Sequence, residues 1–282
     1  MAHQLYNSIH IRLKKHAIDI CSLLLDNMNV DGIQEEEWGL IAYFKQNKIN
    51  EDFQISLDKI RAIAESVEIQ EVPNENWNQL WESNYDIAII NERTIIKAPF
   101  HKKNFQHIYQ IIINPQMAFG TGHHETTHML LDILSSMELK DLKIADIGCG
   151  TGVLSILAHL KQAKEIIGSD YDPLCQTSFH ENMQLNNITN IPFFLSDVTN
   201  PSFLENFKKN RYDIVLANIN RNIILNGIHN LEAICARKSC ILSSGYYLKD
   251  VAIIETAMSK FGLENAETFM RGNWCANRFV RA

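Results

Sequence analysis

The sequence lacks the features that mark several large classes of protein. It contains no run of 18 apolar residues, so no membrane-spanning helix is expected. The first ten residues are polar and lack the apolar core of a secretory signal. None of the six cysteines is spaced as Cys-x-x-Cys, so neither a zinc site nor a redox pair is predicted. Free thiols in a chain of this size favour a reducing cytoplasm as its location.

Positive charge is also in short supply. Lys and Arg number 26 against 33 Asp and Glu, which gives a net charge of −7. Because phosphate contacts require clustered Lys and Arg, direct binding of nucleic acid is not expected. The balance instead favours a basic partner. Hydrophobic residues make up 46% of the 282 residues, enough to bury a core in one large domain or two modest ones.

The first 70 residues predict a small α+β domain. Residues 5–13 partly alternate apolar and polar side chains and predict a strand, whereas residues 18–28 place apolar side chains at helical spacing. Residues 38–44 predict another strand, and Ser56 is the expected N-cap of a second helix whose apolar face extends to Val67. This order is typical of split-βαβ, ferredoxin-like units.

Residues 71–110 predict a linker followed by a hairpin. Two apolar runs, residues 87–90 and 94–98, flank the polar sequence Asn91-Glu92-Arg93. Short apolar runs separated by three polar residues favour antiparallel pairing.

From residue 111 to residue 282 the pattern alternates between strands and helices. Expected strands are residues 143–147, 165–169, 191–195, 212–217, 240–244 and, at the sheet edge, 274–280; expected helices include 153–160 and one after Pro173. Such alternation predicts a parallel sheet with helices on both faces, a Rossmann-like α/β fold.

A glycine-rich loop is the sharpest feature of this region. The run Asp146-Ile147-Gly148-Cys149-Gly150-Thr151-Gly152 follows an expected strand and opens an expected helix. Glycines there permit a tight turn and let the backbone approach a ligand. Asp170 ends the next strand, where such sheets place the carboxylate that binds ribose hydroxyls. Together they predict an adenosine-type ligand.

Two ligands of this type compete. The dinucleotide fingerprint is G-x-G-x-x-G, but Val153 stands where its third glycine would be. Asp146 precedes the loop, where it would repel a pyrophosphate but suit the ammonium of an amino-acid tail. S-adenosylmethionine is therefore favoured. A nicotinamide-dependent oxidoreductase and a non-catalytic module of the same fold remain as alternatives.

A second run narrows the prediction. Residues 114–127 read N-P-Q-M-A-F-G-T-G-H-H-E-T-T. With the D-I-G-C-G-T-G loop, this run resembles the ribosomal protein L-eleven methyltransferase family, class I enzymes that carry D-P-x-x-A-F-G-T-G-x-H-x-T-T here. The likeness extends through residues 168–173, 217–219 and 273–275, and so over roughly residues 85–282. Asn114 replaces the aspartate common in the family.

The resemblance implies an activity and a layout. The family methylates amines of the stalk-base protein of the large ribosomal subunit, both lysine side chains and the N-terminal amino group. A small N-terminal domain, here residues 1–70, recognises that basic protein, and residues 111–282 bind S-adenosylmethionine. A class I enzyme acting on another protein or nucleic-acid amino group is the alternative, although Asn218-Ile219-Asn220 does not match the Asn-Pro-Pro-aromatic run of such enzymes. We expect a monomer.

The resemblance also implies site residues. It assigns cofactor contacts to Thr127, Gly148, Asp170 and Asn218, and the departure at Ile219-Asn220-Arg221 bears on the pocket for the amine. From the residues themselves, the backbone at Gly148, Gly150 and Gly152 would meet the amino-acid end of the cofactor. Phe119 to Gly122 are expected to form a loop over the cofactor. Asp197 is expected either to contact the adenine or to be a simple turn residue. Asn218 is the expected catalytic residue, which would orient the methyl donor or the amine.

Two histidines raise the question of a metal. His124 and His128 are four residues apart, which places two ligands on one helix face. No third ligand stands at a fixed spacing, so no metal site is predicted. Thr126 and Thr127 are also expected at the helix start, where N-capping is the alternative to a role in the site.

Overall fold

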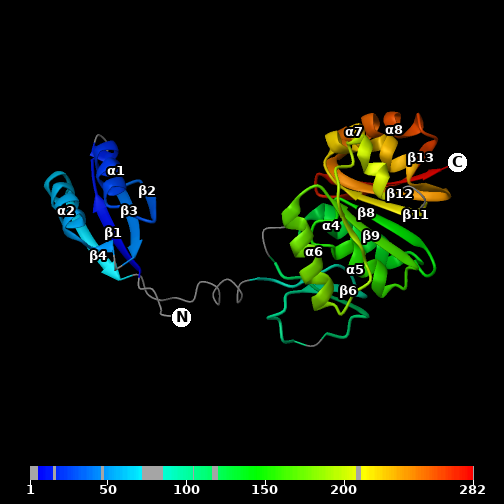
Figure 1. Cartoon of the computed structure of the whole chain (residues 1–282), viewed down its shortest axis with the longest axis horizontal. Coiled ribbons are helices and arrows are strands. Elements are labelled where there is room, and N and C mark those ends of the chain that lie inside the picture. The colour runs from blue at the N-terminus through cyan, green and yellow to red at the C-terminus, as the bar shows by residue number, and fades with distance from the viewer. Residues whose placement is uncertain are drawn as a thin grey trace. The chain divides into compact units, whose positions relative to one another are not determined.

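The computed structural model describes residues 6–14, 17–45, 48–71, 85–103, 105–115, 120–207 and 211–281. The chain forms two compact units, Met1–Tyr85 and Asp86–Ala282, which are described separately (Figure 1). Within the described ranges, no helix has both the length and the apolar character needed to span a membrane.

The first unit is a four-stranded antiparallel sheet with two helices. Its elements are β1 (Tyr6–Arg12), α1 (Ile18–Asn27), β2 (Gly32–Glu36), β3 (Gly39–Lys45), α2 (Glu51–Ile63) and β4 (Ser66–Glu71). The strand order is β2-β3-β1-β4, and the element order β-α-β-β-α-β is that of split-βαβ units. Ile9 and Ile11 of β1 share one core with Leu25 of α1 and with Phe53 and Leu57 of α2.

The start of the second helix differs from the prediction. The N-cap is Asn50, whose side chain accepts a hydrogen bond from the Phe53 amide at 2.8 Å. Ser56, the predicted cap, is buried within the helix, and Val67 belongs to β4 instead of the helix face. Asparagine caps as well as serine does, and acidic residues in the first turn favour the earlier start.

The second unit contains a seven-stranded sheet in the order β10-β9-β8-β11-β12-β14-β13. Its strands are β8 (Lys143–Ile147), β9 (Glu165–Asp170), β10 (Phe193–Leu195), β11 (Tyr212–Asn218), β12 (Cys235–Tyr247), β13 (Leu263–Arg271) and β14 (Trp274–Arg281). Its helices are α4 (Glu125–Ser136), α5 (Val153–Leu160), α6 (Pro173–Leu185), α7 (Arg221–Ala233) and α8 (Val251–Ser259), with 3-10 turns η3 (Pro201–Phe207) and η4 (Leu248–Asp250).

The far side of this sheet corrects two expectations. The first five strands in the order pair in parallel, but β14 runs antiparallel to both of its neighbours. β14 is also not the edge strand, because β13 lies outside it. β13 was not predicted because most of its side chains are exposed or partly exposed and carry no apolar pattern.

Helices cover both faces of the sheet (Figure 1). Successive residues of β8 enter opposite cores: Ile144 packs with α4 and α5, and Ala145 packs with α7 and α8. This double burial explains why the consecutive residues Ile144 and Ala145 are both apolar. Since β8 lies between β9 and β11, the strand order reverses at β8, and such sheets bind ligands at that reversal.

The predicted hairpin is present and belongs to this core. β5 (Ala88–Ile89) pairs antiparallel with β6 (Thr94–Lys97), which pairs in parallel with β7 (Tyr109–Ile112). Ala88 and Ile96 are buried in the core that contains α4 and α5.

Candidate cofactor site

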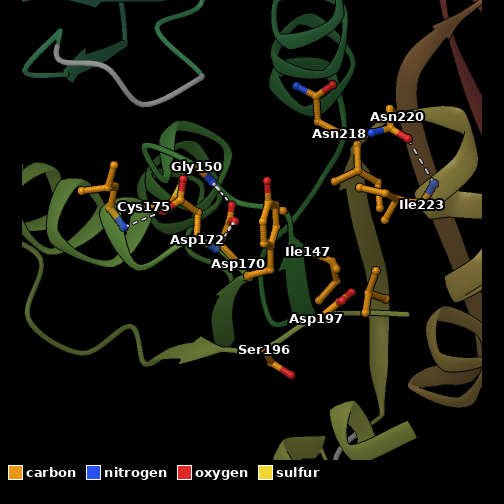
Figure 2. A pocket seen from close by; sticks show the side chains of 15 residues that line it. Ile147, Gly150, Asp170, Asp172, Cys175, Ser196, Asp197, Asn218, Asn220 and Ile223 are labelled. Carbon is orange, nitrogen blue, oxygen red and sulfur yellow. Dashed lines mark hydrogen bonds between the residues drawn. The ribbon is translucent and has the colours of Figure 1, made fainter. Parts of the chain in front are cut away.

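A cavity of about 360 Å³ lies where the strand order reverses, at the carboxyl ends of the strands. It is lined by residues at or just after the ends of four neighbouring strands: Ile147, Gly148 and Gly150 at β8; Asp170, Tyr171, Asp172, Leu174 and Cys175 at β9; Ser196, Asp197 and Val198 at β10; and Asn218, Ile219, Asn220 and Ile223 at β11. In Figure 2, Asp170, Asp172 and Cys175 lie on one side of Ile147, and Asn218, Asn220 and Ile223 lie on the other. The volume is that of a small-molecule site.

The glycine loop requires glycine for reasons that the structure makes explicit. Gly148, Gly150 and Gly152 have φ values of 71°, 52° and 78°, all in the left-handed region. A Cβ on Gly148 would lie 2.1 Å from Cγ2 of Ile219, the residue after Asn218. The loop from β8 and the end of β11 are therefore in contact, and only hydrogen fits between them.

Asp170 is held with its carboxylate toward the cavity. It is 7% exposed; one oxygen accepts from the Gly150 amide at 3.0 Å and the other from the Asp172 amide at 3.1 Å (Figure 2). Each carboxylate oxygen can accept a second hydrogen bond. The residue thus ties β9 to the glycine loop while keeping acceptors for a ligand hydroxyl.

Asn218 lines the cavity and is hydrogen-bonded to Thr127, which is not one of the lining residues. The Asn218 amide nitrogen donates to Oγ1 of Thr127 at 3.0 Å, although the residues are 91 positions apart in sequence. Thr127 is 1% exposed and lies within the first turn of α4, whose N-cap is His124. It is therefore not a capping residue. Oδ1 of Asn218 is buried and has no hydrogen-bond partner among the described residues, so it is an acceptor without a donor.

Asp146 does not lie where the sequence analysis expected it. It is fully buried and does not belong to the cavity lining, so it cannot meet a ligand's ammonium directly. Its Oδ2 accepts from the amide and the hydroxyl of Ser155, at 3.2 and 2.7 Å. Burial raises the pKa of this carboxyl to about 7, despite the opposing effect of these hydrogen bonds.

Asp197 and Phe119 were both candidates for contacts with the cofactor. Asp197 lines the cavity, but its Oδ1 also accepts from the amide and hydroxyl of Thr199, both at 2.8 Å, as a turn residue would. Phe119 lies outside the described residues. Gly120, from the same predicted loop, is described: its carbonyl accepts from Oγ1 of the fully buried Thr151 at 2.7 Å, which attaches this segment to the glycine loop.

The histidines that suggested a metal have other contacts. His124 caps α4 by accepting from the Thr126 amide, and its ring packs edge-on against Trp274. Burial lowers the pKa of His128. Across the ranges that the structure describes, no three potential metal ligands cluster.

Several lining residues escaped the sequence analysis. Tyr171 and Leu174 are 68% and 70% exposed beside the cavity. Asn220 caps α7, with its side chain accepting from the Ile223 amide at 3.1 Å. A usable signal existed: each of these residues lies within four residues after the end of β9 or β11, at the edge where ligands of such sheets bind.

Comparison with known proteins decides the family. The family model described as ribosomal protein L11 methyltransferase (PrmA) matches residues 7–282. The chain belongs to this family. It is 34% identical over 268 residues to the ribosomal protein L11 methyltransferase of Phocaeicola vulgatus, and 35% identical over 266 residues to that of Bacteroides fragilis, with 93% of each chain covered. The resemblance stated from the sequence is thereby confirmed.

A solved structure agrees with the fold. The ribosomal protein L11 methylase of Lactobacillus delbrueckii subsp. bulgaricus superposes with a TM-score of 0.64 at 25% identity, covering 70% of this chain and 99% of that chain. S-adenosylmethionine is the cofactor of the family and of this methyltransferase. The residues fit it: the cavity is lined by Gly148 and Gly150, which expose their backbone, by the carboxylate of Asp170, which can accept further hydrogen bonds, and by Asn218, whose buried amide oxygen has no partner among the described residues.

Proposed function

We propose that this methyltransferase transfers methyl groups to amines of ribosomal protein L11, namely lysine side chains and the N-terminal amino group. The family assignment and the names of its relatives support the protein substrate. The observation that carries the choice of amines is Oδ1 of Asn218, a buried acceptor without a partner among the described residues, on a residue that lines the cofactor cavity. An acceptor there suits a substrate atom that bears hydrogen.

Different residues of the cavity contact different parts of the cofactor. The backbone at Gly148 and Gly150 receives the amino-acid end, and Asp170 accepts from the ribose hydroxyls. Asp197 accepts from the adenine amino group, at the end of the cavity formed after β10. The segment of Phe119 to Gly122 covers the cofactor, attached through Thr151. Thr127 acts by fixing the amide of Asn218, so that its oxygen faces the site.

The reaction requires a neutral amine. A free lysine has a pKa of about 10.4, so nearly all of it is protonated at neutral pH and has no lone pair. S-adenosylmethionine supplies a methyl group already activated by its sulfonium. Oδ1 of Asn218 accepts one amine N–H, which aims the nitrogen lone pair along the transfer direction. Partial burial of the site favours the neutral amine, whose lost proton passes to water.

The first unit is proposed to recognise the substrate. Its two edge strands expose acidic side chains: Glu35 on β2, and Glu68 and Glu71 on β4. Such a surface suits a basic ribosomal protein. We further propose that the chain works as a monomer in the cytoplasm.

Transfer of labelled methyl tests the proposal. Purified chain and labelled S-adenosylmethionine are incubated with ribosomal proteins from cells that lack the modification. We expect label in L11, and we expect Asp170→Ala to reduce it when S-adenosylmethionine is below saturation. A label found only in nucleic acid or in another protein would instead support the alternative substrate, and no label at all would reject methyl transfer.

A further inference from the structure

A second cavity lies beside the cofactor site. Its volume is about 400 Å³, and it is lined by Asn220, Arg221, Tyr247, Lys249, Asp250 and Trp274, among others. Asn220 lines both cavities. Since the cofactor cavity extends from β10 to β11, and β12 and β14 come next in the sheet, the second cavity lies on the side away from Asp170.

Aromatic rings connect the two sites. The rings of Tyr247 and Trp274 lie 4.3 Å apart at 33°, and Trp274 contacts the ring of His124 at 4.9 Å. His124 caps the helix that carries Thr127, the partner of Asn218. The aromatic row therefore begins at the N-cap of α4, three residues before Thr127, and ends in the second cavity.

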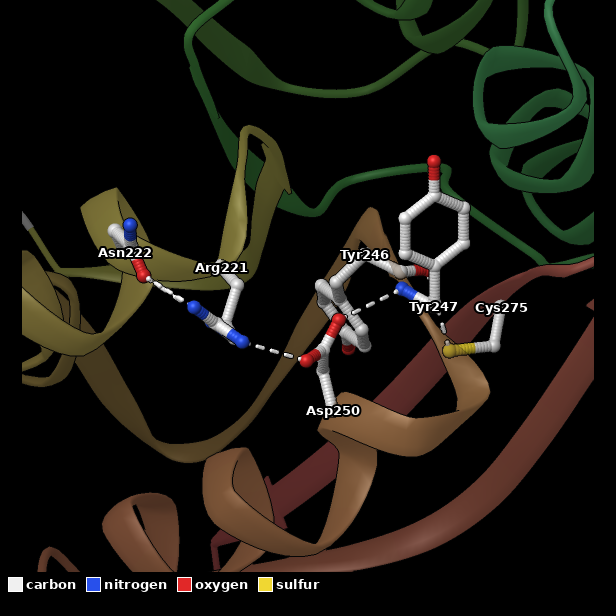
Figure 3. Close-up of polar contacts among 6 residues, drawn as sticks. All are labelled: Arg221, Asn222, Tyr246, Tyr247, Asp250 and Cys275. Atoms are coloured by element: carbon white, nitrogen blue, oxygen red, sulfur yellow. Dashed lines mark hydrogen bonds and ion pairs between the residues drawn. The ribbon is translucent and has the colours of Figure 1, made fainter.

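Charged side chains line this cavity beside its aromatic rings. Asp250 is 7% exposed; one of its oxygens pairs with Arg221 at 2.7 Å, and the other accepts from the Tyr247 amide at 3.2 Å (Figure 3). Its charge is thus compensated. Lys249 instead has its ammonium 5.6 Å from the centroid of Tyr247, within the range of a cation–π contact. The exposed ring already holds an alkylammonium group from its own chain.

We propose that Tyr247 and Trp274 bind the ammonium group of the methylated amine between successive transfers, at the place that Lys249 occupies when no substrate is there. This inference rests on the proposed function, because only an amine substrate acquires this charge. In each transfer the N–C bond forms, the C–S bond breaks and its electron pair stays on sulfur. The positive charge thereby moves from sulfur to nitrogen.

Tyr247 and Trp274 would keep a partly methylated amine near the cofactor site. A mono- or dimethylated ammonium then releases a proton to water and regains its lone pair for the next transfer. A trimethylated nitrogen has no proton to release and remains a cation. Electron-rich aromatic faces are the common recognition element for methylated ammonium groups.

Calorimetry on the full chain, saturated with S-adenosylhomocysteine, tests this inference. The probes are N-acetyl-trimethyllysine methylamide and its uncharged analogue, in which carbon replaces the quaternary nitrogen. We expect the charged probe to bind more tightly, and Tyr247→Leu to weaken it by about two- to fivefold while leaving the neutral probe unchanged. Tyr247→Phe, the matched control, keeps the ring and the affinity. Lys249→Met removes the competing cation and strengthens binding of the charged probe.

Three results would overturn the inference: no binding of the charged probe, equal weakening of both probes by Tyr247→Leu, or loss of affinity in Tyr247→Phe. Product analysis on L11 adds a second readout, in which Tyr247→Leu should shift trimethylated lysine toward mono- and dimethylated forms. An unchanged distribution also contradicts the inference. Failure of the proposed function looks different, because L11 then gains no methyl groups even with the unsubstituted chain.

Discussion

Gly148→Ala is the substitution with the most sharply defined consequences. The added Cβ would lie 2.1 Å from Cγ2 of Ile219, and the φ of +71° is unfavourable for alanine. The left-handed conformation costs about 1–2 kcal/mol, and overpacking typically costs a further 1–3 kcal/mol. We therefore expect the free energy of unfolding to fall by about 2–5 kcal/mol. Because Ile219 follows Asn218, its displacement should also weaken cofactor binding.

Gly262 offers a matched control. Its φ is +70°, but a Cβ there meets nothing within 4 Å. Gly262→Ala should therefore show only the conformational cost, about 1–2 kcal/mol, and should bind S-adenosylhomocysteine normally. In the double variant Gly148→Ala/Ile219→Ala the clashing methyl is gone, so part of the lost stability should return. Urea unfolding and calorimetry measure these quantities. Equal effects of Gly148→Ala and Gly262→Ala on both would refute the reasoning.

Two further predictions concern the acidic residues. Asp170→Ala removes acceptors for the ribose and leaves the Gly150 amide unpaired. Because hydrogen bonds to charged groups contribute about 1.5–3 kcal/mol, the affinity for S-adenosylhomocysteine should fall at least about tenfold. Unchanged affinity in calorimetry would exclude this role of Asp170. The raised pKa of Asp146, about 7 against an ordinary 3.8, means that the folded state binds the proton more tightly than the unfolded state. Stability should thus be lost as pH rises from about 4 to about 7. Asp146→Asn should flatten this dependence in unfolding measured across that range, and a parallel decline in both proteins would contradict the assignment.

Local signals explain what the sequence could predict. β8 and α5 have the predicted bounds because an apolar strand, a glycine turn and an apolar helix follow one another without ambiguity. The hairpin of β5 and β6 was also predicted from a local signal, two short apolar runs separated by three polar residues. Asn50 was missed because Ser56 is also a good capping residue type, and only tertiary packing selects between them. β13 was missed because its exposed side chains carry no alternation.

The location of the site could be predicted from the sequence, but most of its side-chain contacts could not. Strand ends gave the positions of Gly148, Asp170 and Asn218, because parallel strands end at one edge. Position at a strand end does not say which way a side chain points, so Asp146 was expected in a cavity that it does not line. The contact between Asn218 and Thr127 joins distant segments, and no spacing rule predicts it.

Intact mass spectrometry of L11 is the most direct test of amine methylation by this chain. Unmodified L11 is incubated with S-adenosylmethionine and either the unsubstituted protein or Asn218→Ala. The account predicts that the mass rises by one or more methyl groups with the unsubstituted protein, that fragmentation places them on lysine side chains or the N-terminal amine, and that Asn218→Ala slows the increase. An L11 of unchanged mass, or methyl groups on other atoms, would contradict it.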